Sequence, residues 1–89
     1  NLSLQRLDRR DGDAAIRVGF TVTKKEGGSV ERNRIRRRLR EAARLVVAGL
    51  GAPGADYVLI GRRAALDSPF QSLVGDLKEA IAEAERRAA

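Results

Sequence analysis

The sequence contains no cysteine, histidine, methionine or tryptophan. The missing cysteines exclude disulfides and thiolate chemistry, and the missing histidines exclude the commonest general base and the common zinc sites. The only aromatic residues are Phe20, Tyr57 and Phe70. No apolar run approaches the length that crosses a membrane, and no signal-peptide pattern opens the chain, so we expect a cytoplasmic location.

Positive charge is what the sequence has in excess. Lysine and arginine number 18 against 12 aspartates and glutamates, which gives a net charge of +6. A chain of 89 residues has room for one core, so we predict a single domain over residues 1–89. Such a basic domain favours an acidic partner, namely RNA, DNA or an anionic membrane surface. No nucleophile–base pair stands out, and an autonomous enzyme is the least favoured class.

The stretch 27–50 contains seven arginines and two glutamates. Its apolar residues recur at spacings of three and four, which predicts the buried stripe of an α-helix. The predicted stripe comprises Ile35, Leu39, Ala42, Ala43, Val46 and Leu50. On nearly the opposite side, Asn33, Arg37, Arg40 and Arg44 follow one another at helical spacing. The helix therefore has one face for a core and another for a polyanion.

The arginine-rich face has two interpretations. A solvated face held by ion pairs needs alternating signs, and Glu31 and Glu41 are the only acidic residues here. Like charges repel by a few tenths of a kcal/mol per close pair, which a polyanion would relieve. Arginine also binds phosphate through two parallel hydrogen bonds. We therefore favour nucleic acid. A membrane surface is disfavoured because the apolar stripe lacks interfacial aromatics. A DNA major-groove reader is disfavoured because few side chains besides Asn33 and the arginines suit base edges.

The flanking segments predict three strands and a second helix. Residues 2–7 and 14–23 alternate as half-buried strands, Asp11-Gly12 between them favours a hairpin turn, and residues 57–60 form a short buried strand. Ser29 is the expected N-cap of the basic helix, and Ser68 begins a capping box for the second helix. The apolar positions assigned to the core are Ile16, Val18, Phe20 and Val22 in the second strand, and Phe70, Leu73, Val74, Leu77, Ile81 and Ala84 in the last helix. The predicted fold is α+β, a small sheet packed with helices in the order β-β-α-β-α.

Two adjoining segments resemble a known family. The second strand reads R-V-G-F-T-V-T-K-K from Arg17 to Lys25, and the basic helix reads V-E-R-N-R-I-R-R-R-L-R-E from Val30 to Glu41. With the glycine-containing turn between them, they resemble the protein component of bacterial ribonuclease P. That family's pattern is a strand R-V-G-F-x-V-x-K-K, a short turn, and a helix A-V-x-R-N-R-x-K-R-x-x-R-E. The match is strong over residues 17–41 and looser through residues 56–62 to the last helix.

The resemblance implies a function and a topology. The chain would be the small subunit of a ribonucleoprotein endonuclease that removes the 5′ leader of precursor tRNA. In that family the RNA subunit catalyses hydrolysis with bound Mg²⁺, and the protein holds the RNA and the leader without being catalytic itself. The resemblance also implies a left-handed β-α-β crossover, against the right-handed rule for parallel strands. The alternative is a general RNA- or ribosome-binding module without a role in tRNA 5′ processing. Self-association is possible but is not indicated by the sequence.

The resemblance assigns RNA contacts by position. On the basic helix the expected contacts to the catalytic RNA are Arg32, Asn33, Arg34, Arg36, Arg37 and Arg40, and the basic stripe adds Arg44. Lys24, Lys25 and Arg62 are candidates for the same RNA surface or for leader phosphates. Arg17, Phe20 and Thr21 are candidate leader contacts, although Phe20 is more simply a core residue.

Two features depart from the family's pattern. The family has an aromatic-bearing helix before the first strand, which walls one side of the leader cleft, whereas Asn1 lies almost within the first predicted strand. We therefore expect this chain to lack that wall. Glu26 stands where a small apolar residue is usual, and we expect its carboxylate to weaken nearby phosphate contacts.

Overall fold

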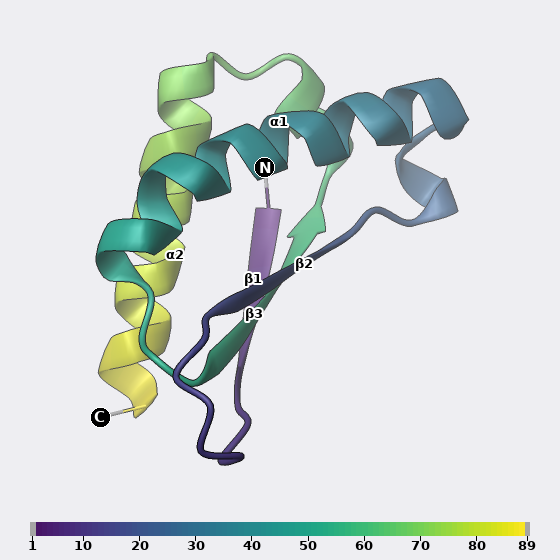
Figure 1. The fold of residues 1–89 in the computed structure, drawn as a ribbon. Helices are drawn as coiled ribbons and strands as arrows, with labels where there is room; N and C mark the ends of the chain where they lie inside the picture. The colour runs from purple at the N-terminus through teal and green to yellow at the C-terminus, as the bar shows by residue number, and fades with distance from the viewer. Residues whose placement is uncertain (1, 89) are drawn as a thin grey trace.

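The computed structural model describes residues 2–88 as a three-stranded sheet and two long helices (Figure 1). The elements are β1 (Leu2–Asp8), β2 (Arg17–Thr21), η1 (Lys24–Glu26), α1 (Ser29–Leu50), β3 (Ala55–Gly61), η2 (Arg63–Leu66) and α2 (Phe70–Ala88), where η denotes a short 3₁₀ helix. The α+β class and the order β-β-α-β-α are confirmed. None of the helices within these residues is long and apolar enough to cross a membrane.

The sheet has the order β1-β3-β2, with β3 antiparallel to β1 and parallel to β2. The predicted hairpin between the first two strands is therefore wrong, because β3 lies between them. Gly12 does form the turn, at φ 79°, but turn chemistry alone does not choose a strand's partner. The most apolar strand takes the centre, and the two strands that carry Arg6, Asp8 and Arg17 take the edges, where charge discourages further pairing.

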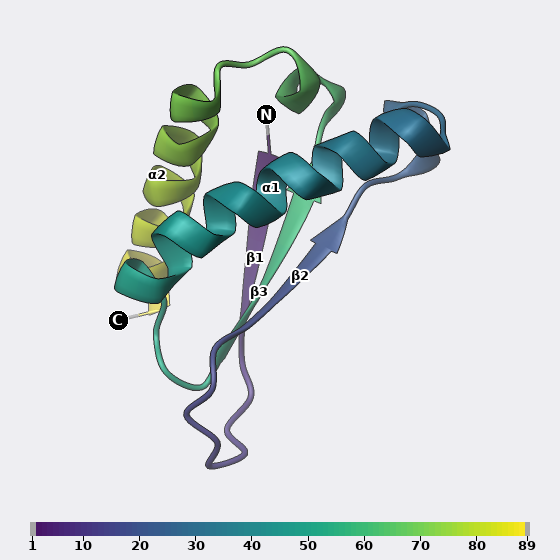
Figure 2. The same cartoon turned by 45° about the horizontal axis from the view of Figure 1, so that its top comes forward.

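The connection from β2 through α1 to β3 is left-handed. In Figure 2 the two parallel strands run upward, α1 crosses in front of them, and the chain moves from β2 leftward to β3. A right-handed connection would place the second strand on the other side. The family resemblance predicts this uncommon hand, whereas general topology rules predict the opposite one.

Both helices bury their apolar stripes against the same face of the sheet. The fully buried large side chains are Tyr57, Ile35, Leu39, Leu59, Leu73, Leu77, Ile81 and Val46. Two residues assigned to the core are largely outside it, since Leu50 is 45% and Phe70 36% exposed at the helix ends. Val47, which the predicted stripe omitted, is buried instead. The prediction failed at helix termini, where periodicity continues but the opposing sheet has ended.

Gly61 sets how closely α1 lies on β3. A Cβ atom at this position would lie 2.6 Å from Cγ2 of Ile35 and 2.8 Å from Cδ1 of Leu39. Both distances are below van der Waals contact, and both the isoleucine and the leucine side chain are fully buried. The absence of a side chain at Gly61 therefore lets the helix rest directly on the end of the central strand.

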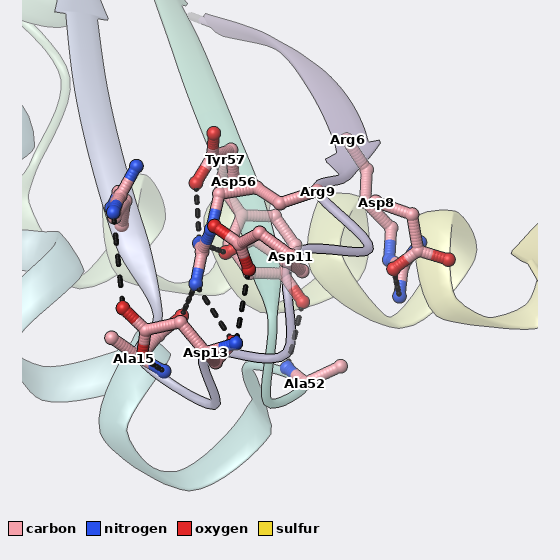
Figure 3. Close-up of polar contacts among 11 residues, drawn as sticks. Arg6, Asp8, Arg9, Asp11, Asp13, Ala15, Ala52, Asp56 and Tyr57 are labelled. Atoms are coloured by element: carbon pink, nitrogen blue, oxygen red, sulfur yellow. Dashed lines mark hydrogen bonds and ion pairs between the residues drawn. The ribbon is translucent and has the colours of Figure 1, made fainter.

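Arg9 ties the loop between β1 and β2 to the sheet (Figure 3). Its guanidinium forms an ion pair with Asp56 at 2.6 Å and donates hydrogen bonds to the carbonyl oxygens of Asp13, Ala15 and Ala55. The carbonyl oxygen of Ala15 accepts a hydrogen bond from Arg9 and so belongs to the loop. The second strand therefore begins at Arg17 and not at residue 14, where it was predicted to begin. An ordered loop has replaced the first residues of the predicted strand.

Tyr57 links three elements through its hydroxyl group. That hydroxyl accepts a hydrogen bond from the backbone N–H of Ala52 at 2.8 Å and donates one to Glu85 on α2. Glu85 also forms an ion pair with Arg6 of β1 at 2.6 Å. The hydrogen bond from Tyr57, and then the charge of Arg6, hold the pKa of Glu85 below its ordinary value. The end of α2 is therefore fixed to both β1 and β3.

Replacing Gly61 with alanine should destabilise the protein, because the added methyl group must displace Ile35 and Leu39. Overpacking of this kind costs about 1–3 kcal/mol. Urea denaturation monitored by circular dichroism measures the change in unfolding free energy. Gly19→Ala in β2 is the matched control, since its Cβ would meet nothing within 4 Å, and its stability should stay at or slightly above that of the parent. Equal destabilisation of the two variants would contradict the close packing at Gly61.

The contribution of Glu85 to stability should depend on pH in a defined direction. Its folded-state pKa is lowered, so the stabilisation is present above the ordinary glutamate value of 4.5 and is lost as the pH falls through the folded-state pKa. The difference in unfolding free energy between the parent and Glu85→Gln should therefore shrink between about pH 6 and pH 3. Glu79→Gln, an exposed position on the same helix, should follow the parent throughout. A constant difference for Glu85→Gln would refute the assignment.

Candidate nucleic-acid interface

The basic helix α1 begins after a glycine-containing turn that lies beside the ends of β2 and β3. Gly28, and not the predicted Ser29, is the N-cap, and its backbone N–H donates to the carboxylate of Glu31 at 3.4 Å. Gly27 has φ 138°, and a Cβ there would lie 2.8 Å from Nη1 of Arg63. The backbone conformation therefore favours glycine at position 27, and a side chain there would also displace the guanidinium of Arg63.

The outward side of α1 is an arginine face. We define it as Asn33, Arg34, Arg36, Arg37, Arg40 and Arg44. All of these side chains are exposed except that of Arg36, which is half-buried. Because Ile35, Leu39 and Val46 are held in the core, the rotation of the helix is fixed and these cations point away from it.

Most of the arginine face has no internal counter-charge. Within residues 2–88, Arg44 is its one member with an ion pair, to Glu41 at 3.4 Å. Glu31, the other acid of α1, is used at the N-cap. Asn33 accepts a hydrogen bond from Arg36 at 3.0 Å through its side-chain oxygen, which leaves the amide NH₂ pointing outward as a donor. The face is therefore arranged to receive negative charge from another molecule.

Two other arginines of α1 lie closer to the protein. Arg38 is half-buried and donates to the carbonyl oxygen of Ser68, so it joins α1 to the segment before α2. Arg32 is also half-buried, and its Nε is shielded from solvent without a hydrogen-bond partner among residues 2–88. The Nε of Arg38 is shielded and unpaired in the same way among these residues.

The carboxyl ends of β2 and β3 form a second cluster of positive charge, which we call the basic edge: Lys24, Lys25, Arg32 and Arg62. Parallel strands end at the same edge of a sheet, so Lys24 and Lys25 after β2 and Arg62 after β3 lie at the same edge. Both lysines and Arg62 are exposed. The basic edge adjoins the first turn of α1 and so continues the arginine face.

A clasp between η1 and η2 fixes the basic edge, and sequence reasoning missed it. Glu26 accepts a hydrogen bond from the backbone N–H of Arg63 at 2.8 Å, and Arg63 Nη1 donates to the carbonyl oxygen of Glu26 at 3.2 Å. The one feature of the sequence that could have indicated this clasp is Glu26 itself, which stands where the family usually has a small apolar residue. The carboxylate is engaged within the fold and is not simply a free charge on the basic edge.

Within residues 2–88, no helix covers the side of the sheet away from α1 and α2, and we call this side the open sheet face. Strand register places its residues in three rows: Ser3–Ile60–Thr21, Gln5–Val58–Gly19 and Leu7–Asp56–Arg17. Arg62 reaches over one end of the face, where its Nη2 lies 3.5 Å from the hydroxyl oxygen of Ser3. Gly19 leaves the middle row without a side chain at β2. The face therefore has an apolar centre at Val58 and Ile60, with Arg62 at one end and Arg17 beside the carboxylate-bearing Asp56 at the other.

The three candidate leader contacts on β2 do not share one surface. Arg17 and Thr21 lie on the open sheet face, but Phe20 points to the side of the helices because successive side chains of a strand alternate. Phe20 is half-buried at the margin of the core, and the guanidinium carbon of Arg40 lies 5.6 Å from its ring centroid. The expectation that Phe20 is a core residue is only partly correct.

The chemistry of these surfaces is that of binding. No group of three or more histidine, cysteine, aspartate or glutamate residues within residues 2–88 is placed to hold a metal ion. What the surfaces offer is guanidinium and ammonium groups, amide donors and a patch of apolar sheet. These groups suit phosphates, riboses and unpaired bases.

Comparison with known proteins points the same way. A family model described as Ribonuclease P matches residues 1–85. The ribonuclease P protein component of Ruegeria pomeroyi is 53% identical over 83 residues, which cover 91% of this chain and 66% of that protein. The component of Gluconacetobacter diazotrophicus is 52% identical over 88 residues, or 99% of this chain and 75% of that protein. That of Caulobacter vibrioides is 50% identical over 78 residues, or 88% of this chain and 52% of that protein.

Solved structures share the fold. The RNase P protein of Staphylococcus aureus superposes with a TM-score of 0.72 at 26% identity, over 93% of this chain and 73% of that one. The RNase P protein of Thermotoga maritima gives a TM-score of 0.75 at 24% identity over 90% and 74%, which supports the fold alone. This chain spans between about half and three quarters of the curated relatives' length. With the matching fold, the basic helix and these relatives together, the chain belongs to the ribonuclease P protein component family.

Proposed function

We propose that this chain acts as the protein subunit of ribonuclease P, the ribonucleoprotein endonuclease that removes the 5′ leader of precursor tRNA. The observation that carries the proposal is the arginine face, which has a single internal ion pair within residues 2–88, on a helix whose sequence and relatives are those of the family. A polyanion that occupies this face satisfies charges that the fold leaves open. The proposal includes a cytoplasmic location, together with the RNA subunit.

In this proposal the RNA subunit performs the hydrolysis and supplies the Mg²⁺ sites. The protein's residues hold RNA in position. The arginine face binds the catalytic RNA through phosphate contacts, each a charge-assisted hydrogen bond or pair of bonds. Asn33 adds an outward amide donor that suits a ribose or a base edge. The protein thereby contributes affinity and orientation, and no bond of the substrate is broken by its side chains.

The leader is assigned to the open sheet face and the basic edge. Val58 and Ile60 give this face an apolar centre against which unpaired bases can lie, and Gly19 keeps it flat. In this proposal Arg17 at one end of the face and Arg62 at the other contact separate phosphates of the leader, with Lys24 and Lys25 beyond. With no aromatic side chain among the three rows, electrostatic contacts supply most of the affinity for the leader.

The decisive experiment is Mg²⁺-dependent cleavage of a precursor tRNA by a bacterial ribonuclease P RNA at low salt, with and without the protein. We expect the protein to stimulate cleavage at the mature 5′ end, because it neutralises phosphate repulsion between the RNA subunit and its substrate. The protein alone should cleave nothing. Binding of the RNA without stimulation would instead favour the general RNA-binding module, and cleavage by the protein alone would overturn the assigned division of labour.

The arginine face should account for a measurable part of the salt dependence of RNA binding. We expect the double substitution Arg34→Gln with Arg37→Gln to weaken binding of the ribonuclease P RNA. The slope of log affinity against log salt should fall by roughly 0.7–0.9 for each phosphate that the variant no longer neutralises. Filter binding at several salt concentrations gives this slope.

A matched control removes the same charge elsewhere. Arg86 and Arg87 are exposed at the end of α2, where both pair with Glu83. The double substitution Arg86→Gln with Arg87→Gln should leave the slope unchanged. If both double variants lower the slope equally, binding depends on net charge and not on the arginine face.

A further inference from the structure

A groove runs between the edge strand β2 and the second half of α1, on the helix side of the sheet. Its volume is about 380 Å³, and it is lined by Ile16, Val18, Phe20, Arg40, Ala43, Arg44, Val47 and Ala48. The floor and walls are therefore aliphatic and aromatic, and the cations lie along one side. The groove faces the opposite direction from the open sheet face and is separate from the assigned leader surface.

The cationic side of the groove is incompletely satisfied. Arg40 has no ion pair within residues 2–88, and its guanidinium carbon lies 5.6 Å from the Phe20 ring centroid, in the range of a cation–π contact. Arg44, one turn further on, pairs only with the exposed Glu41. An apolar groove and a pair of exposed arginines thus lie side by side.

We propose that this groove binds one unpaired nucleotide of an RNA partner, with the base in the groove and the phosphate on Arg40 and Arg44. The inference rests on the proposed RNA-binding function and adds to it a non-electrostatic contact. A nucleotide presents a flat ring system and an anion a few bonds apart, which matches the two halves of this site. Aromatic and guanidinium planes are the surfaces on which unpaired bases stack.

Charge complementarity favours a nucleotide over a segment of protein. An apolar peptide would cover Arg40 and Arg44 without supplying an anion, and burying an unpaired charge is costly. A second copy of this chain would bring a net charge of +6 towards the same arginines. The arginine face includes these same two residues, so an RNA strand already on that face passes directly beside the groove.

The primary test is Phe20→Leu, which keeps an apolar side chain and removes the ring. Binding of a bacterial ribonuclease P RNA should weaken about fivefold or more, the lower end of the effect expected when one base no longer stacks. Because no charge is removed, the salt slope should not change, whereas that of Arg40→Gln should fall by roughly 0.7–0.9. Phe70→Leu, at the start of α2, is the control and should bind as the parent does.

A second variant tests the groove independently, in case Phe20→Leu weakens binding only because it folds poorly. Ala48 is exposed and lines the groove, so Ala48→Leu fills it without disturbing the core. It should weaken RNA binding at an unchanged salt slope, whereas Ala82→Leu on α2 should have no effect. Thermal unfolding of each variant shows whether the fold is retained.

A small probe tests the site directly. Adenosine 5′-monophosphate should shift the methyl resonances of Val18 and Val47 in NMR spectra, and ribose 5-phosphate should not. Equal shifts with both probes would mean a phosphate contact only, and groove resonances that respond to protein concentration alone would mean a second copy. Either result overturns the proposal, as does normal RNA binding by a folded Phe20→Leu and a folded Ala48→Leu. If the parent protein fails to bind the RNA, the proposed function itself fails.

Discussion

The contact of Ile35 and Leu39 with Gly61 is the constraint on which the other features depend. It fixes both the height of α1 above the sheet and the rotation of α1 about its axis. With that rotation set, Arg37, Arg40 and Arg44 point outward, and the N-terminus of α1 lies beside the ends of β2 and β3. The same contact holds the left-handed connection in place, because α1 crosses directly over the end of the central strand (Figure 2). The orientation of the arginine face is therefore a consequence of core packing.

Burial also explains why so basic a helix is stable. Repulsion between neighbouring arginines costs a few tenths of a kcal/mol per close pair. Each fully buried aliphatic side chain such as Ile35, Leu39 or Val46 contributes about 1.5–3 kcal/mol. Three such residues outweigh the repulsion along the helix. The core thus supports a surface that would be unfavourable on an isolated peptide, and a bound polyanion removes the remaining cost.

Much of this arrangement could be predicted from the sequence, because it depends on periodicity. The buried stripe of α1, the alternation along β1 and the family pattern over residues 17–41 all lie within one element or its neighbour. The features that could not be predicted depend on residues far apart in the chain. Placing β3 between β1 and β2 needs long-range pairing, which the turn at Gly12 does not encode. Phe20 is only half-buried, and how much of its ring α1 covers depends on the position of α1 relative to β2.

Glu26 shows how a local expectation changes when its partner is known. An acidic residue beside Lys24 and Lys25 should weaken a phosphate contact if its carboxylate faces the solvent. Here the carboxylate accepts the backbone N–H of Arg63, while the Arg63 guanidinium binds the carbonyl oxygen of Glu26. The charge is engaged close to a cation, and the clasp it forms holds η1 against η2. Glu26, which stands where the family has an apolar residue, therefore adds a hydrogen-bonded link between η1 and η2. This link holds the two lysines and Arg62 at one edge of the sheet.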